Sequence, residues 1–198
     1  MPVRAVFLVG FMGSGKNAVG RELARRLSWD FVDLDARIEA REQQTISEIF
    51  RLRGESAFRL AETNALSDLL ASLERGDRAE HGPSGVEGPG LGHAAKSLQG
   101  DSVVALGGGA FIQEANRKLL RPWPTVFLDA PPDELWRRCE QDGVERPLRK
   151  NRTQFAQLYA ERLPFYREAS LVVETTGKQL ASICEEIEHA LKLGAAKE

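Results

Sequence analysis

Short apolar stretches alternate with helical patterns along most of the chain. The apolar stretches are rich in β-branched residues and are bounded by glycine, proline or charged residues, at positions 5–9, 31–33, 102–106, 125–129 and 171–174. Apolar runs of this kind are typical of strands that are buried on both faces of a parallel sheet. We therefore predict parallel strands at these positions.

Helical patterns fill the intervals between the apolar stretches, at positions 16–27, 46–53, 55–73, 113–120, 132–138, 153–168 and 179–193, with Gly54 ending the second of them. Alternation of strands and helices predicts an open α/β sandwich, in which ligands bind at the carboxyl ends of the strands. A length of 198 residues is enough for one full hydrophobic core, so we expect a single domain over residues 1–198.

One segment departs from this alternation. Residues 76–100 contain seven of the 18 glycines of the chain, together with Pro83 and Pro89, and no aromatic residue. Such a segment has little apolar surface to bury and much conformational entropy to lose. We predict a surface loop that is a tolerated insertion.

Charge and cysteine content narrow the class of protein. The chain has 27 Lys and Arg residues against 29 Asp and Glu residues, a net charge of −2, which argues against a protein that coats nucleic acid. Cys139 and Cys184 lack CxxC spacing, and the three histidines are scattered, so we expect reduced thiols and no zinc site. The apolar run at 5–9 is too short to span a membrane. We expect a cytoplasmic protein with no membrane partner.

The strongest chemical signal is the sequence GFMGSGKN at positions 10–17. It follows a predicted buried strand and begins an amphipathic helix, which is the setting of a phosphate-binding P-loop. Glycines let successive backbone N–H groups point at phosphate oxygens, and the helix N-terminus adds positive partial charge. Lys16 should reach the β- and γ-phosphates of a nucleotide.

Asn17 stands where the P-loop motif has serine or threonine, whose hydroxyl normally binds Mg²⁺. An asparagine carbonyl oxygen could replace it, because Mg²⁺ takes oxygen donors. Asp33 and Asp35 follow the next predicted strand, and strand alternation would put both on one side of the chain. One carboxylate would then serve the metal and the other a substrate hydroxyl.

Four further features of the sequence could carry chemistry. Arg59 and Glu62 are spaced to pair on a helix, whether at a site or as an ordinary surface ion pair. Three consecutive glycines at 107–109 would let a ligand approach the backbone closely. An arginine-rich stretch at 139–153 reads as a mobile lid over the phosphates or as a solvated loop. Arg162 lies close to Pro164, which we expect to break its helix.

The motifs GFMGSGK, DLD, GESAFR, GGGA, ERPL and ERLPFY occur in this order, and together they resemble the shikimate kinase family. The resemblance covers nearly the whole chain apart from residues 76–100. It implies a five-stranded parallel sheet sandwiched by helices, of the nucleoside-monophosphate-kinase type, with a lid. It also implies ATP as cosubstrate, Mg²⁺ as cofactor and phosphorylation of a shikimate hydroxyl.

The resemblance further implies a role for individual residues. Asp35 would hold the reacting hydroxyl, Arg59 and Arg162 would clamp the shikimate carboxylate, and Glu62 would orient Arg59. Lys16 and Arg146 would contact the transferring phosphate, and Arg138 would lie beside the adenine. The remaining implied contacts are with the substrate ring for Gly107, Gly108 and Gly109, with ATP for Gly13, Ser14, Gly15, Asn17 and Ala18, and with Mg²⁺ for Asn17 and Asp33.

Other interpretations stay open at this point. A P-loop motor or nucleic-acid ATPase would use an acid such as Asp129 to hold metal, although helix capping explains Asp129 more simply. A catalytically silent nucleotide-binding module is compatible with Asn17. Another small-molecule kinase, such as a gluconate kinase, would lack the Arg59 and Arg162 clamp. The expected partners are shikimate and ATP, and the expected oligomeric state is a monomer.

Overall fold

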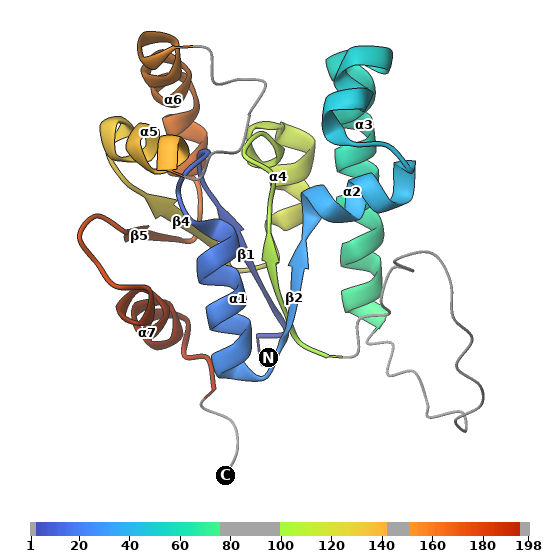
Figure 1. Ribbon diagram of the computed structural model, residues 1–198. Coiled ribbons are helices and arrows are strands. Elements are labelled where there is room, and N and C mark those ends of the chain that lie inside the picture. Colours follow the sequence, from blue (N-terminus) through green and yellow to red (C-terminus); the bar gives the residue numbers. More distant parts are fainter. Residues whose placement is uncertain (1–2, 76–99, 142–150, 195–198) are drawn as a thin grey trace, which may run out of the picture.

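The computed structural model describes residues 3–75, 100–141 and 151–194. One five-stranded sheet forms its centre, with strand order β2-β3-β1-β4-β5 and every pairing parallel (Figure 1). The strands are β1 (Ala5–Val9), β2 (Asp30–Asp33), β3 (Ser102–Ala105), β4 (Thr125–Asp129) and β5 (Leu171–Glu174). The predicted parallel α/β architecture is confirmed.

Helices cover both faces of this sheet (Figure 1). Those that the structure describes are α1 (Lys16–Leu27), α2 (Leu34–Glu42), α3 (Ile46–Arg75), α4 (Glu114–Leu120), α5 (Pro132–Gln141), α6 (Arg152–Tyr166) and α7 (Leu180–Leu191), with a 3₁₀ turn η1 (Ala110–Ile112). The predicted insertion at 76–100 and the predicted lid at 139–153 fall largely outside the described residues.

Side-chain alternation along the central strand β1 divides the core into two layers. Phe7 and Val9 pack with α2 to α6, whereas Val6 and Leu8 pack with α1 and α7. All five residues of β1 are buried, as expected of a strand covered on both faces. Because its neighbours β3 and β4 run parallel to it, the segments that follow these strands meet at one edge of the sheet.

The segment after β2 differs from the sequence prediction. We expected Asp33 and Asp35 to alternate along one strand, but β2 ends at Asp33 and α2 begins at Leu34. Asp33 caps this helix, since its Oδ1 accepts hydrogen bonds from the N–H groups of Asp35 at 3.0 Å and Ala36 at 3.5 Å. Burial of Leu34 and Ile38 against the core holds the helix in place.

Two helices test the predicted helix ends. Gly54 interrupts α3 with φ +80° and ψ 172°, a conformation that favours glycine, and it separates two helical parts as predicted. The break expected at Pro164 is wrong, because α6 continues through it to Tyr166. Pro164 lies only two residues before the helix end, where few main-chain hydrogen bonds remain to be lost.

Asp129 does not cap the next helix. Helix α5 begins at Pro132, so Asp129 lies too early to be its capping residue, and its Oδ1 instead accepts a hydrogen bond of 2.7 Å from the Tyr159 hydroxyl. Cys139 and Cys184 are both buried free thiols, as expected.

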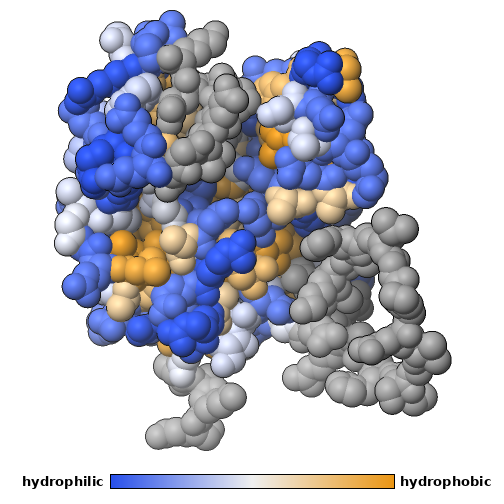
Figure 2. Space-filling view, in the orientation of Figure 1, coloured by the Kyte–Doolittle hydropathy of each residue, from blue (hydrophilic) through white to orange (hydrophobic). Residues whose placement is uncertain are grey.

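The outer surface is mostly polar. On the face shown in Figure 2, hydrophilic residues dominate and apolar ones gather in small patches between the helices. Among the helices that the structure describes, none is long and apolar enough to cross a membrane.

Candidate active site

A pocket of about 750 Å³ lies at the carboxyl edge of the sheet. The P-loop and the start of α1 supply Met12, Gly13, Gly15, Lys16, Asn17 and Ala18. The residues singled out in the sequence that also line it are Asp33, Asp35, Arg59, Glu62, Gly107, Gly108, Gly109, Arg138 and Arg162. The structure thus brings nearly all the predicted site residues to one cavity. Ser14 is buried and does not line it, and Arg146 lies outside the described residues.

The P-loop turns sharply between β1 and α1. Gly10, Gly13 and Gly15 all have positive φ, of 147°, 78° and 86°. At Gly13 a Cβ atom would also lie within 3.0 Å of Leu135 O and Cys139 Sγ on α5. Glycine is therefore required at this position both by its conformation and by the close approach of α5.

Lys16 lies back over the loop that precedes it. Its Nζ donates hydrogen bonds to Gly10 O at 2.9 Å, Phe11 O at 3.0 Å and Ser14 Oγ at 3.3 Å. The ammonium is thus placed at the mouth of the loop, next to the N-terminus of α1, where phosphate oxygens could replace these acceptors. The buried Ser14 serves here as one of the supports of Lys16.

Asn17 and Asp33 are joined across the pocket floor. The amide Nδ2 of Asn17 donates a 2.6 Å hydrogen bond to Asp33 Oδ2. Since the nitrogen of the amide faces Asp33, its oxygen faces away from that carboxylate. The two predicted metal ligands are therefore neighbours.

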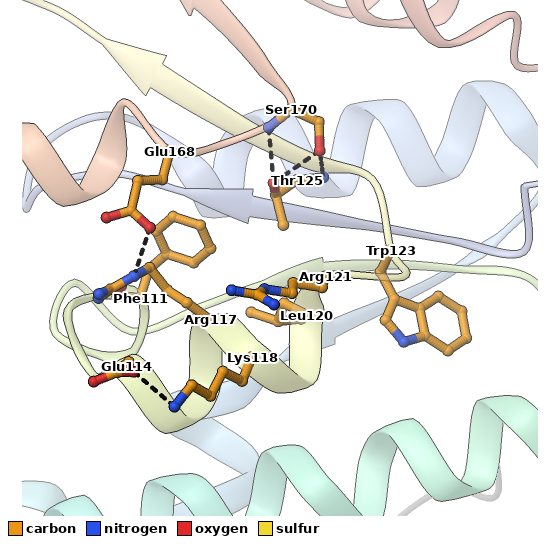
Figure 3. A pocket seen from close by; sticks show the side chains of 10 residues that line it. All are labelled: Phe111, Glu114, Arg117, Lys118, Leu120, Arg121, Trp123, Thr125, Glu168 and Ser170. Carbon is orange, nitrogen blue, oxygen red and sulfur yellow. Dashed lines mark hydrogen bonds and ion pairs between the residues drawn. The ribbon is translucent and has the colours of Figure 1, made fainter.

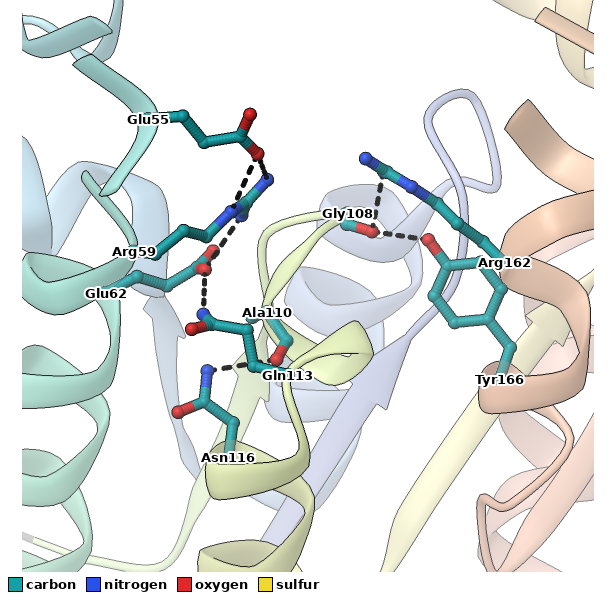
Figure 4. Close-up of polar contacts among 9 residues, drawn as sticks. All are labelled: Glu55, Arg59, Glu62, Gly108, Ala110, Gln113, Asn116, Arg162 and Tyr166. Atoms are coloured by element: carbon teal, nitrogen blue, oxygen red, sulfur yellow. Dashed lines mark hydrogen bonds and ion pairs between the residues drawn. The ribbon is translucent and has the colours of Figure 1, made fainter. Parts of the chain in front are cut away.

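Arg59 is held on both sides by carboxylates of its own helix (Figure 4). Its Nη1 donates to Glu62 Oε2 at 2.9 Å, and its Nε and Nη2 donate to Glu55 Oε1 at 3.3 and 3.1 Å. The Glu62 side chain is completely buried, whereas that of Glu55 is 64% exposed. The inner ion pair fixes the guanidinium, and the outer one is open to exchange with solvent ions.

Glu62 occupies an unusual environment for a carboxyl group. Its Oε2 also accepts a 2.8 Å hydrogen bond from Gln113 Nε2, while its buried Oε1 has no hydrogen-bond partner among the described residues. Burial raises the pKa of Glu62 to about 7; Asp35 adds to the rise, and Arg59 opposes it.

The three glycines after β3 differ in what surrounds them. A Cβ atom at Gly107 would lie within 3.0 Å of Asp35 Oδ1, and one at Gly109 would lie within 3.0 Å of the Arg59 guanidinium. At Gly108 the nearest heavy atom would be 3.7 Å away, an ordinary contact. A side chain would therefore meet close neighbours at Gly107 and Gly109, and only ordinary contacts at Gly108.

Arg162 reaches the same loop from the other side, on α6 (Figure 4). Its Nη1 donates to Gly108 O at 3.2 Å, and the Tyr166 hydroxyl donates to the same oxygen. Arg59 and Arg162 therefore approach the Gly108 loop from opposite sides, which leaves the pocket between two guanidinium groups.

Arg138 borders the pocket from α5. Its Nε donates to Glu134 at 2.9 Å, and its Nη1 and Nη2 donate to Thr175 Oγ1 at 3.0 Å and Thr175 O at 3.3 Å. Thr175 directly follows β5, so Arg138 ties α5 to the segment at that end of the sheet.

Several residues of the site were not singled out in the sequence. Glu55 and Tyr166 lie inside quoted motifs, but nothing in the motifs showed their contacts with Arg59 and Gly108. Gln113 contacts Glu62 across 51 positions of sequence, and such long-range partners leave no local signal.

A second hollow, of about 370 Å³, lies beside the amino end of β4 (Figure 3). Two of the three cations that line it, Arg117 and Lys118, bind carboxylates, Glu168 at 2.9 Å and Glu114 at 2.6 Å, and the third is Arg121. The hollow lies at the amino edge of the parallel sheet, whereas the P-loop lies at the carboxyl edge. Its residues therefore cannot contact phosphates that are bound at the P-loop.

Comparison with known protein sequences gives one family. The family model described as "Shikimate kinase" matches residues 12–75 and 93–192. The chain is 36% identical over 186 residues to the shikimate kinase of Persephonella marina, covering 93% of this chain and 97% of that protein. It is 39% identical over 189 residues to that of Geobacter metallireducens, covering 93% and 90%.

Solved structures of known proteins are also similar to this chain. Shikimate kinase from Acinetobacter baumannii in complex with shikimate is 30% identical, with a TM-score of 0.77 over 98% of this chain and 96% of that one. A gluconokinase from Sinorhizobium meliloti, at 18% identity and a TM-score of 0.55 over 97% and 94% of the two chains, shares the fold alone.

Proposed function

Because the chain belongs to the shikimate kinase family, we propose that it transfers the γ-phosphoryl group of ATP to a hydroxyl group of shikimate. The products are shikimate 3-phosphate and ADP, in the precursor pathway of the aromatic amino acids. The observation that carries this function is one pocket that is lined by a P-loop lysine, by Asp35 and by two arginines, Arg59 and Arg162.

Arg59 and Arg162 hold the shikimate carboxylate. Guanidinium groups form charge-assisted, paired hydrogen bonds with planar carboxylates, and these two lie on opposite sides of the Gly108 loop. Glu62 keeps Arg59 in place from the buried side. The glycines leave room for the ring of the substrate, since a side chain at Gly107 or Gly109 would displace Asp35 or Arg59.

Asp35 receives the hydroxyl that is phosphorylated. Asp35 is the second residue of α2 and lies close to Gly107. Its carboxylate can accept a hydrogen bond from the hydroxyl and take its proton. This arrangement directs the oxygen lone pair at the phosphorus atom, and positioning of this kind supplies much of the rate in phosphoryl transfer.

Lys16 and the backbone of the P-loop bind the phosphates of ATP, with Gly13, Gly15 and Ala18 around them. Lys16 carries positive charge to the γ-phosphate, and Arg146 adds a second cation. Arg138 borders the nucleotide on the adenine side. In this role Arg146 belongs to a lid over residues 139–153, most of which lies outside the described residues.

Asn17 and Asp33 fit a site for Mg²⁺. Both present oxygen donors in the pocket, and the amide nitrogen of Asn17 is turned to Asp33, which leaves its oxygen for a cation. Bound there, the ion would neutralise charge on the β- and γ-phosphates. Among the described residues no cluster of three or more His, Cys, Asp or Glu side chains could hold a metal without the nucleotide.

Two other functions remain as alternatives. A catalytically silent nucleotide-binding module would have no use for the two arginines that line the same pocket as Asp35. Another P-loop kinase, such as a gluconate kinase, would accept a sugar acid, and the substrate range therefore has to be measured.

The wider setting follows from composition and surface. We propose a monomer, because the exposed large apolar residues of the described part of the chain are spread over three elements: Leu52 and Leu60 on α3, Val172 on β5 and Leu180 on α7. Buried free thiols and a net charge of −2 support a cytoplasmic enzyme that binds neither nucleic acid nor membrane.

The test is ADP release coupled to a reporter, with purified protein, MgATP and shikimate. Turnover with shikimate and none with gluconate supports the proposal. Asp35→Asn is the matched control, because it keeps the shape of the side chain and loses the base. A flat trace with shikimate would overturn the proposal, and turnover with gluconate alone would favour the other kinase.

A further inference from the structure

The carbonyl oxygen of Gly108 accepts two hydrogen bonds from one helix (Figure 4). One comes from Arg162 Nη1 at 3.2 Å and the other from the Tyr166 hydroxyl, one turn further along α6. A carbonyl oxygen has two lone pairs, so these donors together saturate it. The peptide between Gly108 and Gly109 is thereby tied to α6.

Tyr166 is the fixed member of this pair of donors. Its side chain is completely buried, and its ring stacks on Phe127 of β4 with centroids 5.2 Å apart and an interplanar angle of 23°. Burial raises the pKa of Tyr166 to about 12, so the hydroxyl keeps its proton at neutral pH. Arg162, in contrast, lines the pocket, and its guanidinium group is carried at the end of a long side chain with several rotatable bonds.

We propose that Tyr166 is a positioning residue for substrate binding: its hydroxyl fixes the Gly108 peptide, and that peptide fixes the Arg162 guanidinium. The inference rests on the proposed function, in which Arg162 binds the carboxylate of shikimate. One N–H of Arg162 is committed to Gly108, which leaves the other guanidinium N–H groups for a ligand of the pocket that Arg162 lines.

The same peptide also governs the opposite wall. Gly107 is packed against Asp35 and Gly109 against Arg59, each too closely for a Cβ atom. The Gly108 carbonyl group lies between these two contacts, so its hydrogen bonds to α6 help to hold the loop that makes them. The buried Tyr166 hydroxyl thus supports a loop that packs against Arg59 and also binds Arg162.

Replacement of Tyr166 by phenylalanine tests this role. Tyr166→Phe keeps the ring on Phe127 and removes only the donor. We expect the KM for shikimate to rise roughly threefold to tenfold, the effect of one hydrogen bond of ordinary net strength. The KM for ATP should stay unchanged, because the Tyr166 hydroxyl bonds Gly108 and not a residue of the P-loop.

Tyr159→Phe is the matched control. Tyr159 lies on the same helix, is also buried, and donates its hydroxyl proton to Asp129 Oδ1 at 2.7 Å. Its loss removes a hydrogen bond to a carboxylate and so should lower the melting temperature at least as much as Tyr166→Phe. It should leave the KM for shikimate unchanged, which separates positioning from stability.

A binding measurement without turnover identifies the group that is positioned. Calorimetry is carried out with shikimate and with its methyl ester, which lacks the carboxylate charge. Tyr166→Phe should weaken shikimate binding and leave the weaker binding of the ester unchanged, because Arg162 acts on the carboxylate. Equal loss for both ligands would overturn the inference.

A second variant at position 166 keeps the test decisive if Tyr166→Phe does not fold. 4-Aminophenylalanine at position 166, introduced by codon suppression, keeps an N–H donor at the end of the ring and should restore wild-type affinity for shikimate. Loss of affinity in this variant would overturn the inference, as would a Tyr166→Phe enzyme with wild-type KM. Wild-type protein that does not bind shikimate would overturn the proposed function and the inference with it, so the two failures are distinct.

Discussion

The amide nitrogen of Asn17 lies 2.6 Å from Oδ2 of Asp33, and the other oxygen of Asp33 caps helix α2. The residue that replaces the usual P-loop hydroxyl is therefore connected, through one carboxylate, to the helix that carries Asp35. Both oxygens of Asp33 already accept hydrogen bonds from the protein. A metal ion at this site competes with those bonds.

Asn17→Ser should lower the Mg²⁺ concentration needed for half-maximal rate. Serine supplies a hydroxyl oxygen at the usual position and releases Asp33 Oδ2 from the amide, so more oxygen donors become available to the ion. The measurement is a titration of Mg²⁺ at fixed ATP, with Mn²⁺ binding by electron paramagnetic resonance as a readout that needs no turnover.

Asn17→Ala serves as the comparison for this variant. It removes both the amide oxygen and the bond to Asp33, and the Mg²⁺ requirement should rise. An unchanged or higher requirement in the serine variant would show that the asparagine oxygen is already an adequate ligand or plays no part.

Arg59→Lys and Arg162→Lys should each raise the KM for shikimate far more than the KM for ATP. An ammonium group cannot form the paired hydrogen bonds of a guanidinium, and one lost charge-assisted contact costs about 1.5–3 kcal/mol. Arg53→Lys is the control, since Arg53 pairs with Glu42. A variant at 59 or 162 that loses ATP affinity and keeps shikimate affinity would show that the carboxylate binds elsewhere.

Alanine substitutions in the glycine loop should have unequal effects. None of the three glycines has positive φ, so the difference arises from space alone. Gly107→Ala displaces Asp35, and Gly109→Ala displaces Arg59, whereas the methyl group at Gly108 meets only ordinary contacts. We expect kcat/KM for shikimate to fall at least tenfold at 107 and 109, and less at 108. Equal losses at all three positions would contradict the packing described for the loop.

Glu62→Gln should change how stability depends on pH. The pKa of Glu62 is about 7 in the folded protein against an ordinary value of 4.5, so the folded state binds more protons between these values. The wild type therefore loses stability as pH rises from 4.5 through 7, by at most about 3.4 kcal/mol. Glutamine does not titrate and removes this slope.

Urea unfolding of both proteins at pH 4.5, 5.5, 6.5 and 7.5 measures this difference. Parallel curves for the wild type and Glu62→Gln would mean that Glu62 titrates alike in the folded and unfolded states.

The sequence predicts those parts of the molecule whose cause is local. The P-loop could be predicted from its glycines, which adopt positive φ in the structure, and from the lysine beside them. The interruption of α3 could be predicted from Gly54. The start of α2 could also be predicted locally, because Asp33 is a good capping residue and Leu34 and Ile38 have helical spacing. The prediction that Asp33 and Asp35 alternate along a strand was wrong because the segment from Leu34 follows the period of a helix.

Contacts between distant segments could not be predicted in this way. The bond from Gln113 to Glu62 and that from Tyr166 to Gly108 join residues 51 and 58 positions apart. The raised pKa of Glu62 depends on burial by several segments at once, and a sequence pattern carries no measure of it.

Glu55 has a consequence for how the pocket responds to salt. Its carboxylate oxygen sits on the Nε and Nη2 edge of Arg59, one of the two edges on which a guanidinium binds a planar carboxylate. A substrate acid that takes this edge replaces an anion that is already there, so the number of ion pairs at Arg59 stays constant. Dissolved salt screens the exposed Glu55 pair and the incoming pair alike. Binding at this arginine is thus an ion exchange, and its free energy should vary little with ionic strength.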